Sequence, residues 1–170
     1  LAESISLCRC LNDAVAHGGD RRTSTIGSLS MRILLAVDGS PYTQKMLDYL
    51  AAHAEWLGDT HSYTALTVQP PLPPRAAKAL GKELVGDYYA EEAQKALNPV
   101  HKFLETHHLD GQCESKIGHI AETIAEMADN CGFDLLIMGT RGHGALAKLV
   151  MGSVATQVLA QCKLPVLLIR

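Results

Sequence analysis

The chain has 170 residues, a length typical of one domain, and 47% of them are hydrophobic, which is enough for a layered core. The net charge is −3 and aromatic residues make up only 5% of the chain. This composition argues against a nucleic-acid partner and against binding to an anionic membrane surface, because such partners require clustered Lys and Arg, and bases stack on aromatic rings.

The cysteines and the hydropathy of the chain bear on its compartment. Five cysteines occur at irregular spacing without a CxxC pair, so neither a disulfide framework nor a zinc site is indicated. No apolar run reaches the roughly 18 residues that a membrane span needs. We therefore expect reduced thiols in a cytoplasmic protein.

The first thirty residues differ in composition from the rest of the chain. They are rich in Ser, Thr and Gly, and Met31 stands directly before the first strand-like segment, as a natural start would. Our hypothesis is that residues 1–30 form an extension, poorly structured or weakly helical, outside a functional domain that covers residues 31–170.

The first half of that domain alternates strand and helix signals. Residues 32–37 form an apolar run that is typical of a buried parallel strand. Ser40 as N-cap and Pro41 at the first helical position predict a helix that runs to about Leu57 and stops at Gly58. A second strand is predicted over residues 61–68, and a proline-rich stretch then forces an extended connection.

The second half continues the alternation. A long helical pattern covers residues 77–107, in which Pro99 predicts a kink or a restart capped by Asn98. Asp110-Gly111 predicts a turn. The remaining predicted elements are a strand at 112–117, a helix at 120–130, a strand at 133–139, a helix at 154–161 and a strand from Leu164 to Ile169.

Strands that alternate with helices predict an α/β fold, a doubly wound parallel sheet of five strands with helices on both faces. In such sheets ligands bind beyond the carboxyl ends of the strands, at the point where the winding reverses. His119 follows the third predicted strand there, where it either lines a pocket or caps the next helix.

A glycine-rich loop, residues 139–153, lies between the fourth predicted strand and the last helix. Glycine allows close backbone approach, and a helix N-terminus offers unpaired N–H groups, so this loop indicates a phosphate site. No Walker A string GxxxxGK[ST] is present. The loose dinucleotide fingerprint that begins at Gly142 lacks the acidic residue expected about 20 positions later, so a nicotinamide or flavin site is disfavoured.

The loop instead has the pattern Gly-x2-Gly-x9-Gly-Ser, at Gly139, Gly142, Gly152 and Ser153. Together with the segments at 33–40, 134–139 and 164–170, this pattern resembles the universal stress protein family, in the branch that binds ATP. The resemblance covers Met31 to Arg170. It implies a Rossmann-like sheet of the adenine nucleotide alpha hydrolase type, a homodimer, and ATP, AMP or ADP as ligand.

The resemblance also implies a nucleotide site that is spread over the strand ends and the glycine-rich loop. Val68 would contact adenine through its backbone, and Met138 would lie along the ribose. The implied nucleotide-binding residues are Ala36, Val37, Asp38, Val68, Met138, Gly139, Arg141, Gly142, His143, Gly152, Ser153, Val154 and Ala155.

Several of these residues allow two interpretations. Asp38 would bond a ribose hydroxyl or hold Mg²⁺ at the phosphates, or it is a plain turn-forming residue. Arg141 and His143 either add positive charge over the phosphates or belong to a solvated loop.

The functional hypothesis is an ATP-binding, regulatory stress-response module that dimerises through Leu164 to Ile169, an apolar edge strand. One alternative is a nucleotide-independent dimerisation scaffold. Another is a slow ATPase or an adenylating enzyme, although no GxSxG elbow is present and the loop at 38–40 lacks the pyrophosphate-binding sequence of the adenylating enzymes. We therefore expect no catalytic residues and at most slow ATP hydrolysis.

Overall fold

Residues 30–144 and 150–170 are described by the computed structural model, and five parallel strands form its sheet in the order β3-β2-β1-β4-β5. The predicted extension falls outside these ranges apart from Ser30, so its separation from the domain stays a prediction. In chain order the elements are β1 (Arg32–Ala36), α1 (Pro41–Ala52), α2 (Ala54–Leu57), β2 (Ser62–Gln69), α3 (Pro74–Leu80), α4 (Lys82–Thr106), β3 (Asp110–Ile117), α5 (Ile120–Asn130), β4 (Leu135–Gly139), α6 (Ser153–Gln161) and β5 (Val166–Ile169).

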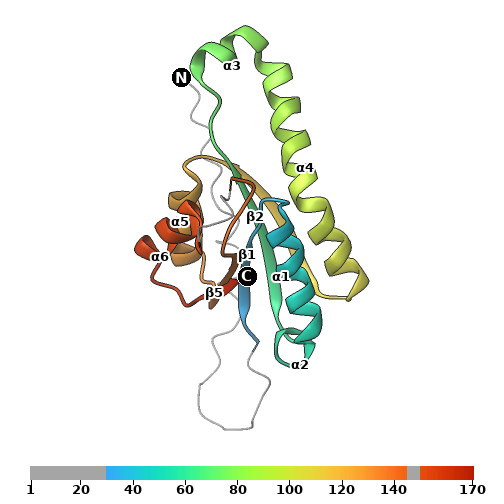
Figure 1. Cartoon of the computed structure of the whole chain (residues 1–170). Helices are drawn as coiled ribbons and strands as arrows, with labels where there is room; N and C mark the ends of the chain where they lie inside the picture. The colour runs from blue at the N-terminus through green and yellow to red at the C-terminus, as the bar shows by residue number, and fades with distance from the viewer. Residues whose placement is uncertain (1–29, 145–149) are drawn as a thin grey trace, which may run out of the picture.

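The sheet is doubly wound, as predicted. The chain moves outward from β1 to β2 and β3, then returns to β4 on the other side of β1 and continues to β5. Helices α1 and α4 cover one face of the sheet, and α5 and α6 cover the other (Figure 1). The winding therefore reverses between β1 and β4, which fixes where a ligand site of this fold class lies.

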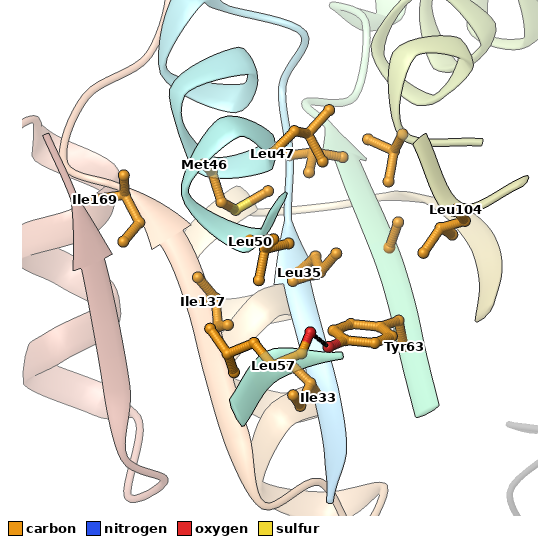
Figure 2. Close-up of a cluster of buried hydrophobic side chains, with 13 residues drawn as sticks. Ile33, Leu35, Met46, Leu47, Leu50, Leu57, Tyr63, Leu104, Ile137 and Ile169 are labelled. Atoms are coloured by element: carbon orange, nitrogen blue, oxygen red, sulfur yellow. Dashed lines mark hydrogen bonds between the residues drawn. The ribbon is translucent and has the colours of Figure 1, made fainter. Parts of the chain in front are cut away.

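Side-chain alternation along β1 explains why its sequence is apolar without interruption. Ile33 and Leu35 point into the core under α1 and α4, where they meet Leu50 and other residues (Figure 2). Leu34 points to the opposite core, under α5 and α6. Both faces of β1 are buried, so the side chains that alternate between the two faces are apolar on both.

The first helix begins as predicted but is interrupted before its predicted end. The Ser40 hydroxyl accepts from the Tyr42 backbone N–H at 3.2 Å, and Pro41 occupies the first turn. The helix stops at Ala52, and α2 follows as a separate turn. The interruption falls at His53, whose φ of −120° and ψ of 34° are not helical. The His53 ring Nδ1–H donates to the Tyr49 carbonyl at 2.8 Å, and the ring stacks on Tyr49.

Of the two alternatives predicted for Pro99, a kink or a restart, the restart is wrong. Helix α4 runs through Pro99 without a restart at Asn98, and the break falls instead at Gly81, whose φ is +80°. A proline inside a helix costs about 3 kcal/mol. The residues on both sides of Pro99 are buried, Ala96 against the turn at Gly39 and Val100 in the core beside β1, and this burial offsets the cost.

The predicted turn at Asp110-Gly111 is wrong, because both residues are part of β3 and pair with Ser62 and Tyr63 of β2. The chain turns earlier, at His108, whose φ is +54°. A Cβ at Gly111 would lie 2.8 Å from a methyl group of Leu104, so this glycine permits the end of α4 to approach the strand closely. Strands β4 and β5 each begin two residues later than predicted.

The remaining sequence expectations concern thiols and membrane spans. Cys113 and Cys162 are free thiols. Burial raises the pKa of Cys113 and of Cys162 above the ordinary thiol value. Within the described ranges, no helix has the length and the apolar character to cross a membrane.

Candidate functional site

A cavity of about 410 Å³ opens at the carboxyl ends of β1 and β4, where the winding reverses. All residues of the predicted nucleotide site line it, although their contact with a nucleotide stays a prediction. Four further lining residues were not predicted: Thr43, Ile120, Ile124 and Gly144. The structure thus brings together residues from β1, β2, β4, α1, α5, α6 and the glycine-rich loop.

One side of the cavity is apolar. Val37 and Val68 extend from the ends of β1 and β2, and Met138 lies near the end of β4. Ile120 and Ile124, one helical turn apart on α5, complete this wall. Their spacing indicates a helix face that is directed to the sheet, but a sequence pattern does not distinguish a core position from a cavity wall.

Asp38 stands at the end of β1 and is held by its own loop. Its Oδ1 atom accepts from the Ser40 N–H at 2.9 Å and from the Thr43 hydroxyl at 3.1 Å. The same hydroxyl oxygen accepts from the N–H groups of Asp38 and Gly39, both at 3.2 Å. Thr43 therefore positions the carboxylate, and among the described residues no donor reaches its second oxygen, Oδ2.

The second carboxylate oxygen of Asp38 lies against Gly142 of the glycine-rich loop. A Cβ at Gly142 would overlap Oδ2. His143 makes a second contact between the loop and Asp38, because its ring Nε2–H donates to the Asp38 backbone carbonyl at 2.9 Å. These two contacts join the loop to the end of β1. Asp38 therefore forms a local turn and also lines the cavity.

The polar end of the cavity contains a helix N-terminus. Gly152 is the N-cap of α6, and no side chain among the described residues caps this helix. The first N–H groups of a helix have no partner within it. Ser153, Val154 and Ala155 carry these groups and line the cavity, so the site offers backbone donors and a positive dipole end to an anion.

Arg141 borders the polar end from the other side. Its Nη1 donates to the Tyr42 hydroxyl at 3.1 Å, and the residue is half-buried rather than fully solvated. His119 is the N-cap residue of α5, but its side chain makes no capping hydrogen bond and does not line the cavity. Residues 145–149 of the glycine-rich loop lie outside the described ranges.

This arrangement suits a ligand with one flat apolar part and one anionic part. In the described portion of the chain, no cluster of three or more His, Cys, Asp or Glu side chains could hold a metal ion. A cation here would need ligands from the bound molecule besides Asp38. The groups that show a pKa shift, Tyr63 and the two cysteines among them, do not line the cavity.

Comparison with known proteins identifies the family of the chain. The sequence profile of the universal stress protein family matches residues 30–170. A universal stress protein of Thermus aquaticus is 33% identical over 146 residues, which cover 81% of this chain and 97% of that protein. A universal stress protein of Synechocystis sp. is 32% identical over 139 residues, 82% of this chain. The chain belongs to the universal stress protein family.

The relatives differ in length. The match covers only 42% of the Synechocystis protein and 52% of a universal stress protein from Methanocaldococcus jannaschii, which is 35% identical over 88 residues, 52% of this chain. The chain thus spans about half of these two relatives.

Solved structures share the fold at lower identity. UspA from Lactobacillus plantarum has a TM-score of 0.65 at 23% identity, over 82% of this chain and 97% of that one. An Arabidopsis thaliana family protein with AMP bound has a TM-score of 0.59 at 14% identity, over 82% and 90%. An Archaeoglobus fulgidus universal stress protein in complex with dAMP has a TM-score of 0.57 at 21% identity, over 82% and 98%.

Proposed function

We propose that this chain binds an adenine nucleotide in the cavity between β1 and β4 and acts as a regulatory module of the stress response. The observation that carries this proposal is the pairing of an apolar wall with the uncapped N-terminus of α6 in one cavity. The apolar wall suits a purine ring, and the helix N-terminus suits phosphate oxygens. The AMP and dAMP complexes of proteins with this fold support the choice of ligand.

Within this proposal ATP is the ligand, and Mg²⁺ joins its phosphates to Asp38. The free Oδ2 atom of Asp38 is an oxygen ligand of the type that Mg²⁺ prefers. The same atom could instead accept from a ribose hydroxyl. Titration with ATP in the presence and the absence of Mg²⁺ separates these roles, because only the first makes the effect of Asp38→Asn depend on the metal.

In this proposal the protein is cytoplasmic and has a regulatory role rather than that of a fast enzyme. A regulatory role requires that two conformations of the protein differ in nucleotide affinity. We expect the glycine-rich loop to be the segment that responds, because Gly142 and His143 join it to Asp38 at the cavity. Slow ATP hydrolysis is compatible with this role, and pyrophosphate release is not expected.

Substitution at Gly152 tests the proposed site. Gly152→Glu places a carboxylate beside the α6 N-terminus, and like-charge repulsion should weaken ATP binding by more than about 100-fold. Gly152→Ala is the matched control, because its Cβ would lie 3.4 Å from the nearest atom, an ordinary contact. Isothermal titration calorimetry should show ATP affinity close to wild type for the alanine variant.

Two results would count against the proposal. Equal ATP affinity in Gly152→Glu and wild type would place any nucleotide elsewhere on the molecule. No heat with ATP·Mg, together with no nucleotide in mass analysis of freshly purified and denatured protein, would favour the alternative of a nucleotide-independent scaffold.

A further inference from the structure

A second cavity, of about 200 Å³, lies beside the first and has a different character. Tyr42, Lys45, Thr140, Arg141 and Arg170 line it. Arg141 is the residue that borders both cavities. The other four do not line the first cavity, so this cavity needs an account of its own.

The lining of this second cavity is strongly cationic. Three of its five residues carry a positive charge at neutral pH, and none is acidic. In the described ranges, no carboxylate lies within 4.0 Å of Lys45, Arg141 or Arg170. The whole chain has a net charge of −3, so this concentration of positive charge is local.

Contacts within the protein gather these cations around the cavity. Arg141 donates to the Tyr42 hydroxyl at 3.1 Å, and its guanidinium carbon lies 5.9 Å from the centre of the Tyr42 ring. The Lys45 ammonium lies 5.1 Å from the same ring. Both distances are within the range of cation–π attraction, so Tyr42 holds two of the three cations near one another.

The third cation is placed by the sheet. The Thr140 backbone N–H donates to the Ile169 carbonyl at 2.8 Å, which fixes the end of β5 beside the end of β4. Arg170 follows directly on Ile169 and lines the cavity together with Thr140, which is only 5% exposed. The first two turns of α1, the end of β4 and the end of β5 thus form the walls.

We propose that this cavity is a second anion site, which binds a phosphate group next to the nucleotide pocket. Two cationic forks and one ammonium suit the several oxygens of a phosphate, and a tyrosine hydroxyl adds a polar contact. The phosphate is either the terminal group of a polyphosphate nucleotide that passes Arg141, or free inorganic phosphate. The first source rests on the proposed function, and the second does not.

Four variants test the site without touching Arg141. Lys45→Met and Arg170→Met remove one cation each and retain much of the apolar stem. Lys102→Met on α4 and Arg75→Met on α3 are matched controls, since both are exposed and line neither cavity. Each protein is titrated calorimetrically with AMP, with ATP and with inorganic phosphate, and thermal unfolding checks that each variant folds.

The two phosphate sources give different results. If the site holds a terminal phosphate, Lys45→Met and Arg170→Met should each lower ATP affinity about tenfold and leave AMP affinity unchanged. If it holds free phosphate, the same variants should have about tenfold lower affinity for inorganic phosphate and the ATP affinity of wild type. The two control variants should match wild type in all three titrations.

The proposal is overturned if the cavity variants, still folded, match wild type with ATP and with phosphate. It is also overturned if the control variants show the same losses, because the effect would then come from net charge alone. If wild type binds neither AMP nor ATP, the proposed function fails by itself, and the phosphate titration alone decides on the second site.

Discussion

At the scale of single residues, the contact between Gly142 and Asp38 is the most demanding feature of the cavity. A Cβ at Gly142 would overlap the Asp38 carboxylate, which Ser40 and Thr43 hold in place. Gly142→Ala should therefore push the loop from the end of β1 and lower ATP affinity by at least about tenfold, a change equivalent to about 1.4 kcal/mol.

Gly144→Ala is the control for this substitution, since a Cβ there meets nothing within 4 Å. Calorimetry should give wild-type ATP affinity for Gly144→Ala and weakened binding for Gly142→Ala, with similar thermal unfolding in both. Equal affinities in the two variants would mean that the contact with Asp38 has no part in binding.

The resemblance to the family implied most of the cavity lining, and the glycines and strand ends that carry this resemblance are local signals. Thr43 was not predicted, because its contact with Asp38 depends on how the first turn of α1 folds back on the end of β1. Lys45 and Arg170 are far apart in sequence and give no local signal, since the sheet order alone brings α1 and β5 together.

At the scale of elements, the Tyr63 hydroxyl joins β2 to the end of α2. It donates to the Leu57 carbonyl, and the carbonyl of Gly58 lies 3.3 Å away (Figure 2). Burial raises the pKa of Tyr63 from 10.0 to about 12. The neutral form is therefore favoured in the folded protein more than in the unfolded chain.

This difference in pKa predicts an alkaline instability. The stabilisation is complete below pH 10 and is lost as the pH rises from 10 to about 12, because the unfolded tyrosine releases its proton first. The free energy of unfolding of wild type should fall over this interval by about 2–3 kcal/mol more than that of Tyr63→Phe. Urea denaturation at graded pH measures both.

An exposed tyrosine supplies the control. Tyr88 on α4 is 44% exposed, so Tyr88→Phe should retain the pH dependence of wild type. Parallel curves for wild type and Tyr63→Phe between pH 10 and 12 would contradict the assigned pKa. Below pH 10, wild type should be the more stable protein by about 1 kcal/mol, the contribution of one hydrogen bond.

The existence and order of the elements follow from the sequence, whereas their interruptions do not. Hydrophobic periodicity indicates each strand and helix because both faces of the sheet are covered. The continuity through Pro99 depends on packing of α4 against the rest of the domain, which is not a local property. Gly111 was predicted in a turn because the sequence does not show that Leu104 of α4 packs against it in the strand.

At the scale of the whole molecule, the two edges of the sheet differ. Edge strand β3 carries Asp110, Glu114 and Lys116, whereas β5 consists of four apolar residues, three of them half-buried. Charges blunt an edge against pairing, and an apolar edge invites it. We therefore expect a homodimer through β5, in line with the segment Leu164 to Ile169 that the sequence indicated.

Proline substitutions at the two edges test this expectation. The carbonyls of Pro165 and Ile169 face β4, so in a parallel ladder the N–H of Leu168 points to the free edge. Leu168→Pro should give a monomer in sedimentation velocity, because it removes a donor from the pairing edge. Ser115→Pro blocks the β3 edge in the same way and should leave the dimer intact.

The reverse result would place the interface on β3. A monomeric wild type at all concentrations would refute pairing altogether. Circular dichroism of both variants checks that each sheet remains formed, since proline is tolerated on edge strands when its nitrogen faces solvent.

The packing of Gly39 against α4 has a mechanical consequence. A Cβ at Gly39 would lie 3.0 Å from the Ala96 Cα, so the turn after β1 touches the backbone of this helix. Helix α4 extends past the end of the sheet together with α3 (Figure 1), and Leu84 stands about 18 Å along the axis from Ala96. A small rotation of α4 about this contact would move the far end of the helix by a larger distance. We therefore expect a spectroscopic probe at Leu84 to respond when a ligand binds at Asp38.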